Sequence, residues 1–238
     1  MLAELIRANQ PCVVLTGAGV STESGIPDFR SAEGIWTHYD PYVVASIDGF
    51  RESPERVWEF YGLRLDVLRD ARANPAHLAI AELERRGLVQ AVITQNVDRL
   101  HAAAGSRDVI EVHGSIGSAV CLSCGHGEED VRPLLPLPRC AHCGAVLKPG
   151  VVMFGELLPV DAIDRAQALA ESAELLLVVG TSLEVWPVAG LPGATLEHGG
   201  KLVIVNRDPT PYDRRAELVV HGSAGEVLAA CVRTMSSS

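Results

Sequence analysis

Four of the six cysteines fall into two close pairs. Cys121 and Cys124 are separated by two residues, as are Cys140 and Cys143, and 15 residues lie between the pairs. This spacing is typical of a zinc site made of four thiolates. Because four thiolates complete a tetrahedron and leave no position for water, the sequence predicts one structural zinc ion rather than a catalytic one.

Polar residues follow three apolar runs of the chain. One cluster begins at Gln95, another is His113 with the glycine after it, and the third spans 180–182. A histidine after a buried strand is either a hydrogen-bonded structural residue or a general base, since its side chain accepts a proton near neutral pH. Its place beside two other polar strand ends makes His113 the candidate base.

A glycine-rich turn follows the first apolar run. Gly17 and Gly19 come directly after residues 12–16. Such a turn lets backbone N–H groups approach a pyrophosphate. However, Thr22 stands where a dinucleotide fingerprint has its third glycine, and no strand about 20 residues later presents an acidic residue. The pattern therefore fits either a phosphate-binding turn or a simple tight connection.

Short runs rich in Val, Ile and Leu predict the strands that position these groups, at 12–16, 89–94, 109–112, 175–180, 201–205 and 217–220. The runs are unbroken, as in parallel sheets covered on both faces. Helical patterns lie between them at 54–70, 75–87, 159–172 and 224–235. This alternation predicts an α/β fold with a doubly wound, mainly parallel, Rossmann-like sheet, whose strand ends gather the functional groups.

Two stretches, 31–72 and 115–150, do not fit the alternation and are marked by Gly and Pro, with Cys in the second. We expect them to build a second, smaller module. The expected division gives 1–37, 73–114 and 151–238 to a Rossmann-like domain. It gives 38–72 and 115–150 to a small domain with a helical part and a zinc-binding part.

Composition narrows the functional classes. The 238 residues are 47% hydrophobic and carry a formal net charge of -10, which disfavours a general electrostatic grip on nucleic acid. No apolar run approaches the roughly 20 residues needed to span a bilayer, and charges near the amino terminus argue against a signal peptide. We expect a cytoplasmic monomer that binds neither membranes nor nucleic acids.

Together these segments resemble the sirtuins, the NAD-dependent protein lysine deacylases. The matching pieces occur in family order over nearly the whole chain: 17–30, 94–101, His113 with Gly114, the paired cysteines, 151–156, 180–182, and Val205 with Asn206.

The resemblance implies an NAD site. Asn96 and Asp98 would hold the nicotinamide carboxamide, and Phe29 would guard its pocket. The full set of expected NAD contacts is Gly17, Ala18, Gly19, Ser21, Glu23, Ile26, Pro27, Asp28, Phe29, Arg30, Trp36, Gln95, Asn96, Val97, Asp98, Gly180, Thr181, Ser182, Asn206, Arg207, Asp208 and Ala224.

It also implies the reaction and the partner. His113 would act as general base on the ribose hydroxyls, and the products would be nicotinamide, free lysine and O-acyl-ADP-ribose. The partner would be an acylated-lysine protein or peptide. A substrate-binding strand would read its backbone, which tolerates many target sequences; the residues are Val151, Val152, Phe154, Gly155 and Glu156.

The helix predicted at 54–70 carries Tyr61 and, three residues later, Arg64, so both side chains reach one site. Taken alone, Arg64 would extend its head into water or pair with an internal carboxylate. The pair resembles the mark of sirtuins that prefer succinyl, malonyl or glutaryl lysine, where the arginine binds the distal carboxylate. Ala45 matches a small residue of that class, whereas Pro41 replaces another alanine. We expect acidic acyl groups to be preferred, with some deacetylase activity.

Four other functions compete with this interpretation. A deacetylase without acidic preference or an ADP-ribosyltransferase would use the same NAD contacts. A nucleic-acid-binding zinc ribbon needs a basic patch, but 115–150 contains three basic and three acidic residues. A dehydrogenase would change the nicotinamide absorbance on turnover, which we do not expect.

Overall fold

The computed structural model describes residues 1–129, 131 and 136–236, so part of the range expected for the small domain lies outside it. Its centre is a six-stranded sheet in which every neighbouring pair is parallel. The spatial order is β3 (Val109–Glu111), β2 (Ala91–Thr94), β1 (Cys12–Thr16), β7 (Leu175–Val179), β8 (Lys201–Val205) and β9 (Leu218–Val220). The strand order reverses between β1 and β7, which is the point where open α/β sheets bind ligands. The predicted fold class is confirmed.

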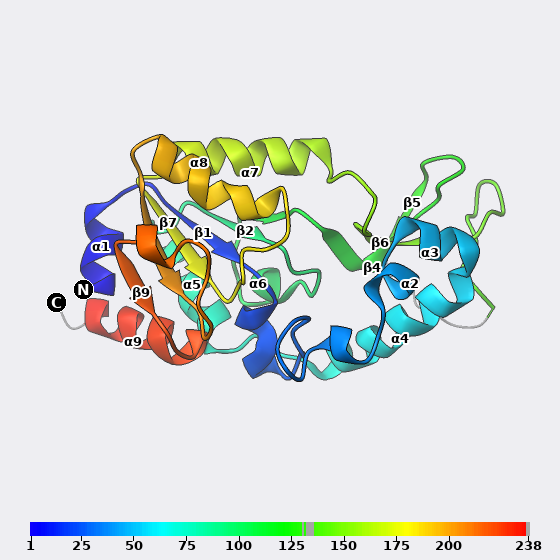
Figure 1. Cartoon of the computed structure of the whole chain (residues 1–238), viewed down its shortest axis with the longest axis horizontal. Coiled ribbons are helices and arrows are strands. Elements are labelled where there is room, and N and C mark those ends of the chain that lie inside the picture. The colour runs from blue at the N-terminus through cyan, green and yellow to red at the C-terminus, as the bar shows by residue number, and fades with distance from the viewer. Residues whose placement is uncertain (130, 132–135, 237–238) are drawn as a thin grey trace.

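Helices cover both faces of the sheet, as Figure 1 shows. Val14, Leu177 and Val203 point into one core, beneath α1 (Leu2–Ala8), α5 (Pro75–Arg85) and α9 (Ala224–Ser236). Their neighbours Val13 and Leu176 point into the opposite core, beneath α7 (Val160–Ser172) and α8 (Leu191–Glu197). Because successive strand residues face opposite sides, burial on both faces requires the unbroken apolar runs seen in the sequence.

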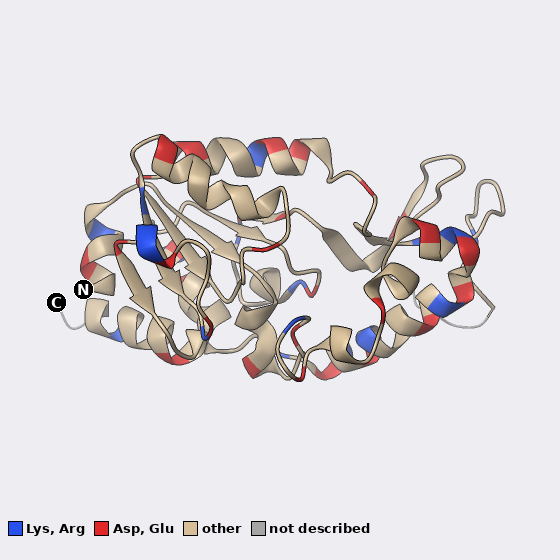
Figure 2. Ribbon diagram, in the orientation of Figure 1, with Lys and Arg blue, Asp and Glu red and all other residues tan. Residues whose placement is uncertain are grey.

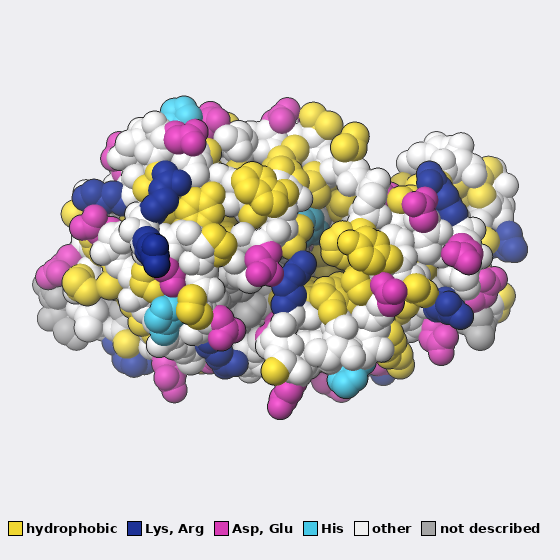
Figure 3. Space-filling view, viewed as in Figure 1, with side chains coloured by type: hydrophobic (Ala, Val, Ile, Leu, Met, Phe, Trp, Pro, Cys, Tyr) yellow, Lys and Arg dark blue, Asp and Glu magenta, His cyan; other side chains and the backbone are white. Residues whose placement is uncertain are grey.

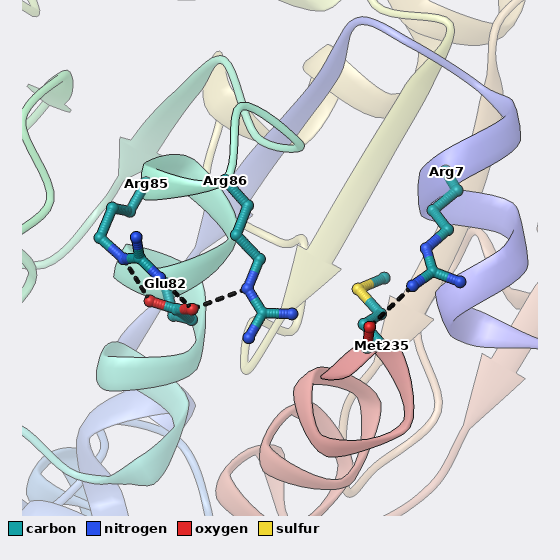
Figure 4. A network of polar contacts seen from close by, with 5 residues as sticks. All are labelled: Arg7, Glu82, Arg85, Arg86 and Met235. Carbon is teal, nitrogen blue, oxygen red and sulfur yellow. Dashed lines mark hydrogen bonds and ion pairs between the residues drawn. The ribbon is translucent and has the colours of Figure 1, made fainter. Parts of the chain in front are cut away.

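Polar contacts secure the outer helices, and Figure 4 shows those made by Arg7 and by Glu82. Arg7 of α1 donates to the backbone oxygen of Met235, 2.9 Å away, near the end of α9. On α5, Glu82 accepts hydrogen bonds from Arg85 and Arg86. The helix ends at Arg85, slightly earlier than predicted, because Gly87 turns the chain with a φ of +71°.

The two irregular stretches pack on one another beside the sheet. The first forms α2 (Pro41–Val44), α3 (Ile47–Glu52) and α4 (Pro54–Asp70), and the second forms an antiparallel sheet of β5 (Gly127–Glu129), β4 (Gly114–Val120) and β6 (Lys148–Val151). Val57 and Trp58 share a core with Leu147, and the Trp58 indole donates to the Leu147 carbonyl at 2.7 Å. Together the two stretches form a second, smaller lobe, which has its own apolar core.

The remaining elements are short: α6 (Leu100–Ala103) and the 3-10 turns η1 (Ala18–Ser24), η2 (Ile35–Thr37), η3 (Val188–Gly190) and η4 (Asp213–Arg215). Along the ribbon of both lobes, positions of Lys and Arg are interspersed with positions of Asp and Glu (Figure 2). Within the described ranges, no helix combines the length and apolar character that crossing a bilayer would require.

Candidate active site

Two glycine-containing loops meet backbone to backbone at the switch point between β1 and β7. The Gly19 N–H donates to the Gly180 carbonyl at 2.8 Å, and a Cβ on Gly180 would lie 2.2 Å from the nitrogen of Val20. Gly180 also has a φ of +61°. Glycine is therefore required there by both space and backbone conformation. The turn at Gly17 leads into the 3-10 turn η1 rather than an α-helix, so it is not an ordinary Rossmann connection.

Ser21, Asn96 and Asp98 form a compact hydrogen-bonded cluster beyond the ends of β1 and β2. The Ser21 hydroxyl donates to Asp98 Oδ2 at 2.7 Å. The Asn96 amide donates to the Ser21 oxygen at 3.0 Å and to Asp98 Oδ2 at 3.2 Å. Asp98 Oδ1 accepts the backbone N–H of Leu100 at 2.9 Å. The Asp98 carboxylate is thereby oriented by several donors.

A buried histidine of α5 supports this cluster. His77 Nδ1 accepts the backbone N–H of Asn74 at 3.3 Å, which leaves Nε2 as the protonated nitrogen, 3.3 Å from the Ser21 hydroxyl. Asn74 in turn donates to the Val20 carbonyl at 2.8 Å and to Ser24 at 3.0 Å. Burial lowers the pKa of His77, against the opposing effect of the nearby carboxylates, so the ring is neutral at pH 7.

A second buried histidine lies against the first. The rings of His77 and His101 meet edge to face with centroids 4.8 Å apart. His101 Nε2 lies 2.9 Å from the Thr16 hydroxyl, which donates to Thr94 at 2.8 Å. Burial, and then the neighbouring His77, lower the pKa of His101 to about 3. The sequence did not single out Asn74, His77 or Thr16 as site residues; an Asn-Pro start to the predicted helix signals a cap, not a role beside Asp98.

His113 follows β3 and is only partly buried. Its Nδ1 lies 3.0 Å from the backbone oxygen of Gln95, so Nδ1 carries the proton and Nε2 keeps its lone pair. Burial lowers the pKa of His113, although the Gln95 carbonyl acts in the opposite direction. Gln95 also donates to Thr181 at 2.9 Å, which ties the ends of β2 and β7. This arrangement suits a base that accepts a proton at Nε2.

The loop after η1 folds back over the strand ends. The Asp28 side chain accepts the backbone N–H groups of Arg30 and Ser31. The Phe29 and Trp36 rings lie 5.0 Å apart, and Arg30 forms an ion pair with Glu184 at 3.3 Å. Ile26 is buried, and it lines a cavity beside α4 together with Pro27. Ser182 is partly buried in the facing loop, and Val97 joins the second lobe by accepting the N–H of Ile116.

The predicted adenosine-side residues lie farther along the same sheet edge. Asn206, just beyond β8, donates to the Asp208 carbonyl at 2.8 Å, and Arg207 beside it is exposed. Ala224 begins α9, where Glu23 accepts the N–H of Gly225 and the hydroxyl of Ser223, both at 2.9 Å. Glu23 therefore holds the loop from β1 against the start of α9. Ala18 lies at the start of η1, between the two glycines.

Tyr61 and Arg64 lie on α4, where Arg64 faces the loop that carries Phe29. The Arg64 guanidinium sits 4.7 Å from the centre of the Phe29 ring and 5.8 Å from that of Phe60. No carboxylate of the described residues lies within ion-pair distance of it. Burial lowers the pKa of Arg64, and Tyr61 and Asp98 oppose that shift. Burial raises the pKa of Tyr61, so its hydroxyl stays protonated. Arg64 also lines an otherwise apolar cavity of about 110 Å³.

Some backbone groups of the predicted substrate-binding strand already form hydrogen bonds within the protein. Val152 donates to the His113 carbonyl at 2.8 Å, and Phe154 pairs with the segment at 45–47. Val151 is buried at the end of β6, and Glu156 pairs with the buried Lys148 at 3.0 Å. Gly155 turns the chain with a φ of +88°. Figure 3 shows hydrophobic side chains on both rims of the hollow between the lobes.

The four paired cysteines come together at the far side of the second lobe. Their sulfur atoms all lie within 4.8 Å of one another, with 3.4 Å between Cys121 and Cys143 and 3.6 Å between Cys124 and Cys140. Zinc–sulfur bonds of about 2.3 Å in a tetrahedron place sulfur atoms about 3.8 Å apart. The cluster is therefore suited to one structural zinc ion, as predicted.

Comparisons with known proteins agree on one family. The Sir2 family profile matches residues 17–187. A protein of Caldivirga maquilingensis named NAD-dependent protein deacetylase is 47% identical over 236 residues, covering 95% of this chain and 89% of that protein. NAD-dependent protein deacylase 1 of Archaeoglobus fulgidus is 45% identical over 234 residues, covering 98% of this chain and 96% of that protein.

Solved structures show the same likeness. The crystal structure of a Sir2 homologue in complex with NAD has a TM-score of 0.94 at 44% identity, covering 99% of this chain and 93% of that one. A Sir2–p53 peptide–NAD+ complex has a TM-score of 0.90 at 39% identity, covering 100% of this chain and 98% of that one. This chain belongs to the Sir2 family.

Proposed function

We propose that this protein removes acyl groups from lysine side chains at the expense of NAD. The observation that carries the proposal is the position of His113, whose bond to Gln95 leaves Nε2 free to accept a proton at the strand ends that also carry the Ser21–Asn96–Asp98 cluster. The names of the relatives and the NAD and peptide complexes of solved Sir2 structures support the same activity.

The roles of individual residues follow from their chemistry. The Asn96 and Asp98 side chains are oriented by their mutual bonds, and the remaining lone pairs of the Asp98 carboxylate can accept the N–H groups of a carboxamide such as nicotinamide. The packed turns at Gly17–Gly19 and Gly180 would admit phosphates close to the backbone. Asn206 and Ala224 would border the adenosine, and Val151–Glu156 would pair with the substrate backbone.

NAD supplies the leaving nicotinamide and the ribose that receives the acyl group. His113 would take a proton from a ribose hydroxyl, making that oxygen the nucleophile that releases the lysine. Because burial keeps His113 neutral at pH 7, the base is ready without prior deprotonation. Phe29 and Trp36 would exclude water from the reacting carbon.

We further propose a preference for short acyl groups that end in a carboxylate. Arg64 supports this, because its guanidinium lies near the Phe29 and Phe60 rings, lacks an ion-paired carboxylate among the described residues, and follows Tyr61, whose hydroxyl stays protonated, by three residues on α4. A partly buried cation without an anion loses part of its hydration, and a substrate carboxylate would supply the missing partner.

The decisive experiment incubates the purified protein with NAD and one lysine peptide in acetyl and succinyl forms. Mass spectrometry should find nicotinamide, the free peptide and O-acyl-ADP-ribose, with kcat/KM higher for the succinyl form. A peptide that gains ADP-ribose would instead identify a transferase. Equal kcat/KM values would remove the acidic preference but keep the deacylase, and absence of nicotinamide release from either peptide would refute both.

A further inference from the structure

Arg99 has an unusual backbone conformation directly after Asp98. Its φ is 60° and its ψ is 13°, in the left-handed region. Among the described residues, Arg99 and Leu183 alone combine a side chain other than glycine's with a positive φ. Glycine would adopt this conformation without the cost imposed by a Cβ. The presence of arginine therefore calls for an explanation in the contacts of its side chain.

The Arg99 side chain crosses from the large lobe to the small one. Its Nε donates to the hydroxyl of Ser115 in β4, and its terminal nitrogen donates to Glu129 of β5 at 2.8 Å. The guanidinium passes close over Gly117, where a Cβ would lie 3.5 Å from it. One side chain thus joins the turn that carries Asp98 to two strands of the small sheet.

Both ends of this connection are held in place. At one end, Asp98 bonds to Ser21 and Asn96 and accepts the N–H of Leu100. At the other end, Glu128, which precedes Glu129 in β5, accepts the N–H of Ala141 at 3.1 Å. Ala141 lies between the second pair of cysteines. A continuous chain of contacts therefore runs from the cysteine cluster to Asp98.

Arg99 also balances charge at this junction. The carboxyl of Glu111 has a raised pKa, caused first by burial and opposed by Arg99, while Asp98 and Glu129 raise it further. Arg99 therefore stands among three acidic groups. The Arg99 and Glu129 side chains are 44% and 70% exposed, so their ion pair contributes little to overall stability. Its effect should be found in geometry rather than in the free energy of unfolding.

We propose that Arg99 is a positioning residue through which the small sheet fixes the Asp98 carboxylate in the nicotinamide pocket. The proposal rests on the proposed function only in assigning nicotinamide to Asp98. It names a residue outside the expected NAD and peptide contacts and outside the cysteine cluster.

The test compares Arg99→Gly, Arg99→Lys, Glu129→Gln and the double variant Arg99→Gly/Glu129→Gln. Glycine removes the guanidinium and relieves the backbone, so its Tm should equal or exceed that of the parent. The KM for NAD and the nicotinamide inhibition constant should nevertheless rise roughly five- to tenfold. The KM for the acylated peptide should change less than about twofold. Arg99→Lys should lose less than Arg99→Gly, because lysine keeps the positive charge although it lacks the several fixed donors of the guanidinium.

Glu129→Gln should show a smaller change in the same direction, and the double variant should match Arg99→Gly, since both substitutions break one connection. Arg51→Ala removes an exposed arginine paired with Asp48 elsewhere in the small lobe and serves as the control. Parent-like NAD and nicotinamide constants in Arg99→Gly, or additive effects in the double variant, would overturn the proposal. If Arg99→Gly fails to fold, an unchanged nicotinamide constant in Glu129→Gln would overturn it. A parent protein that releases no nicotinamide would refute the proposed function instead.

Discussion

In His113, Nδ1 carries the proton and Nε2 has a free lone pair, so the protonation of Nε2 should set the pH dependence of catalysis. The bond to Gln95 fixes the proton on Nδ1, and burial holds the pKa below its usual value of 6.5. A base must be neutral to act, so its activity is present above the folded pKa and is lost as the pH falls through it. We expect kcat/KM to show no loss from this group between pH 7 and 8 and an acid limb below pH 6.5.

Replacing the base tests the same assignment. His113→Asn should lower kcat by roughly 100- to 10,000-fold, the usual loss for a general base. His198→Asn is the matched control, because His198 bonds to a backbone carbonyl at the end of α8, outside the candidate site. A midpoint for the acid limb well above pH 6.5, or a similar loss in His198→Asn, would contradict the assignment.

Arg64 should decide acyl preference. Arg64→Ala removes the cation that would bind the distal carboxylate, so kcat/KM for a succinyl peptide should fall on the order of a hundredfold or more, whereas that for an acetyl peptide should change little. Arg69→Ala, on an exposed turn of the same helix, should alter neither value. Equal losses on both peptides would show that Arg64 has a structural role only.

The start of helix α5 bears directly on the site. Asn74 caps it by accepting the N–H of Ala76 and also holds the Val20 carbonyl. Asn74→Ala should therefore lower the free energy of unfolding by about 1–2 kcal/mol and also raise the KM for NAD. Asp40→Ala is the control: it removes the cap of α2 but has no contact with the loop that contains Val20, so it should affect stability alone. Denaturant titration and NAD kinetics would separate the effects; an unchanged KM in Asn74→Ala would disprove the link.

The reach of sequence reasoning differs between elements. The inner strands β1, β2, β7 and β8 were predictable because they are buried on both faces and leave continuous apolar runs, as in Leu175–Val179, whereas the strands of the small sheet were not predicted. The 3-10 turn at Ala18–Ser24 was not, since its shape depends on contact with Gly180, which is distant in sequence. His77 escaped notice for the same reason: a histidine in an amphipathic helix carries no sign of the serine it meets across the fold. Sequence motifs identified the site residues that follow strands, whereas the residues that hold them in place, such as His77, could be identified only from the structure.

At the scale of the whole molecule, the cysteine cluster borders the apolar core of the small lobe and not the two cores of the large sheet. Cys121 and Cys140 belong to the same apolar core as Val57 and Trp58 of α4, so loss of the metal should loosen both halves of that lobe. The large sheet packs on two other cores and should remain folded.

We therefore expect Cys140→Ala to reduce bound zinc from about one per chain to a small fraction and to lower the Tm. Cys231→Ala, which removes a buried thiol of the large lobe, should leave the zinc content unchanged. Hydrogen exchange distinguishes the lobes: in Cys140→Ala, amides of β4, β6 and α4 should exchange faster while those of β1 and β7 stay protected. Uniform loss of protection across both lobes would show that the two parts unfold as a single unit, and would remove the case for a separately stabilised zinc lobe.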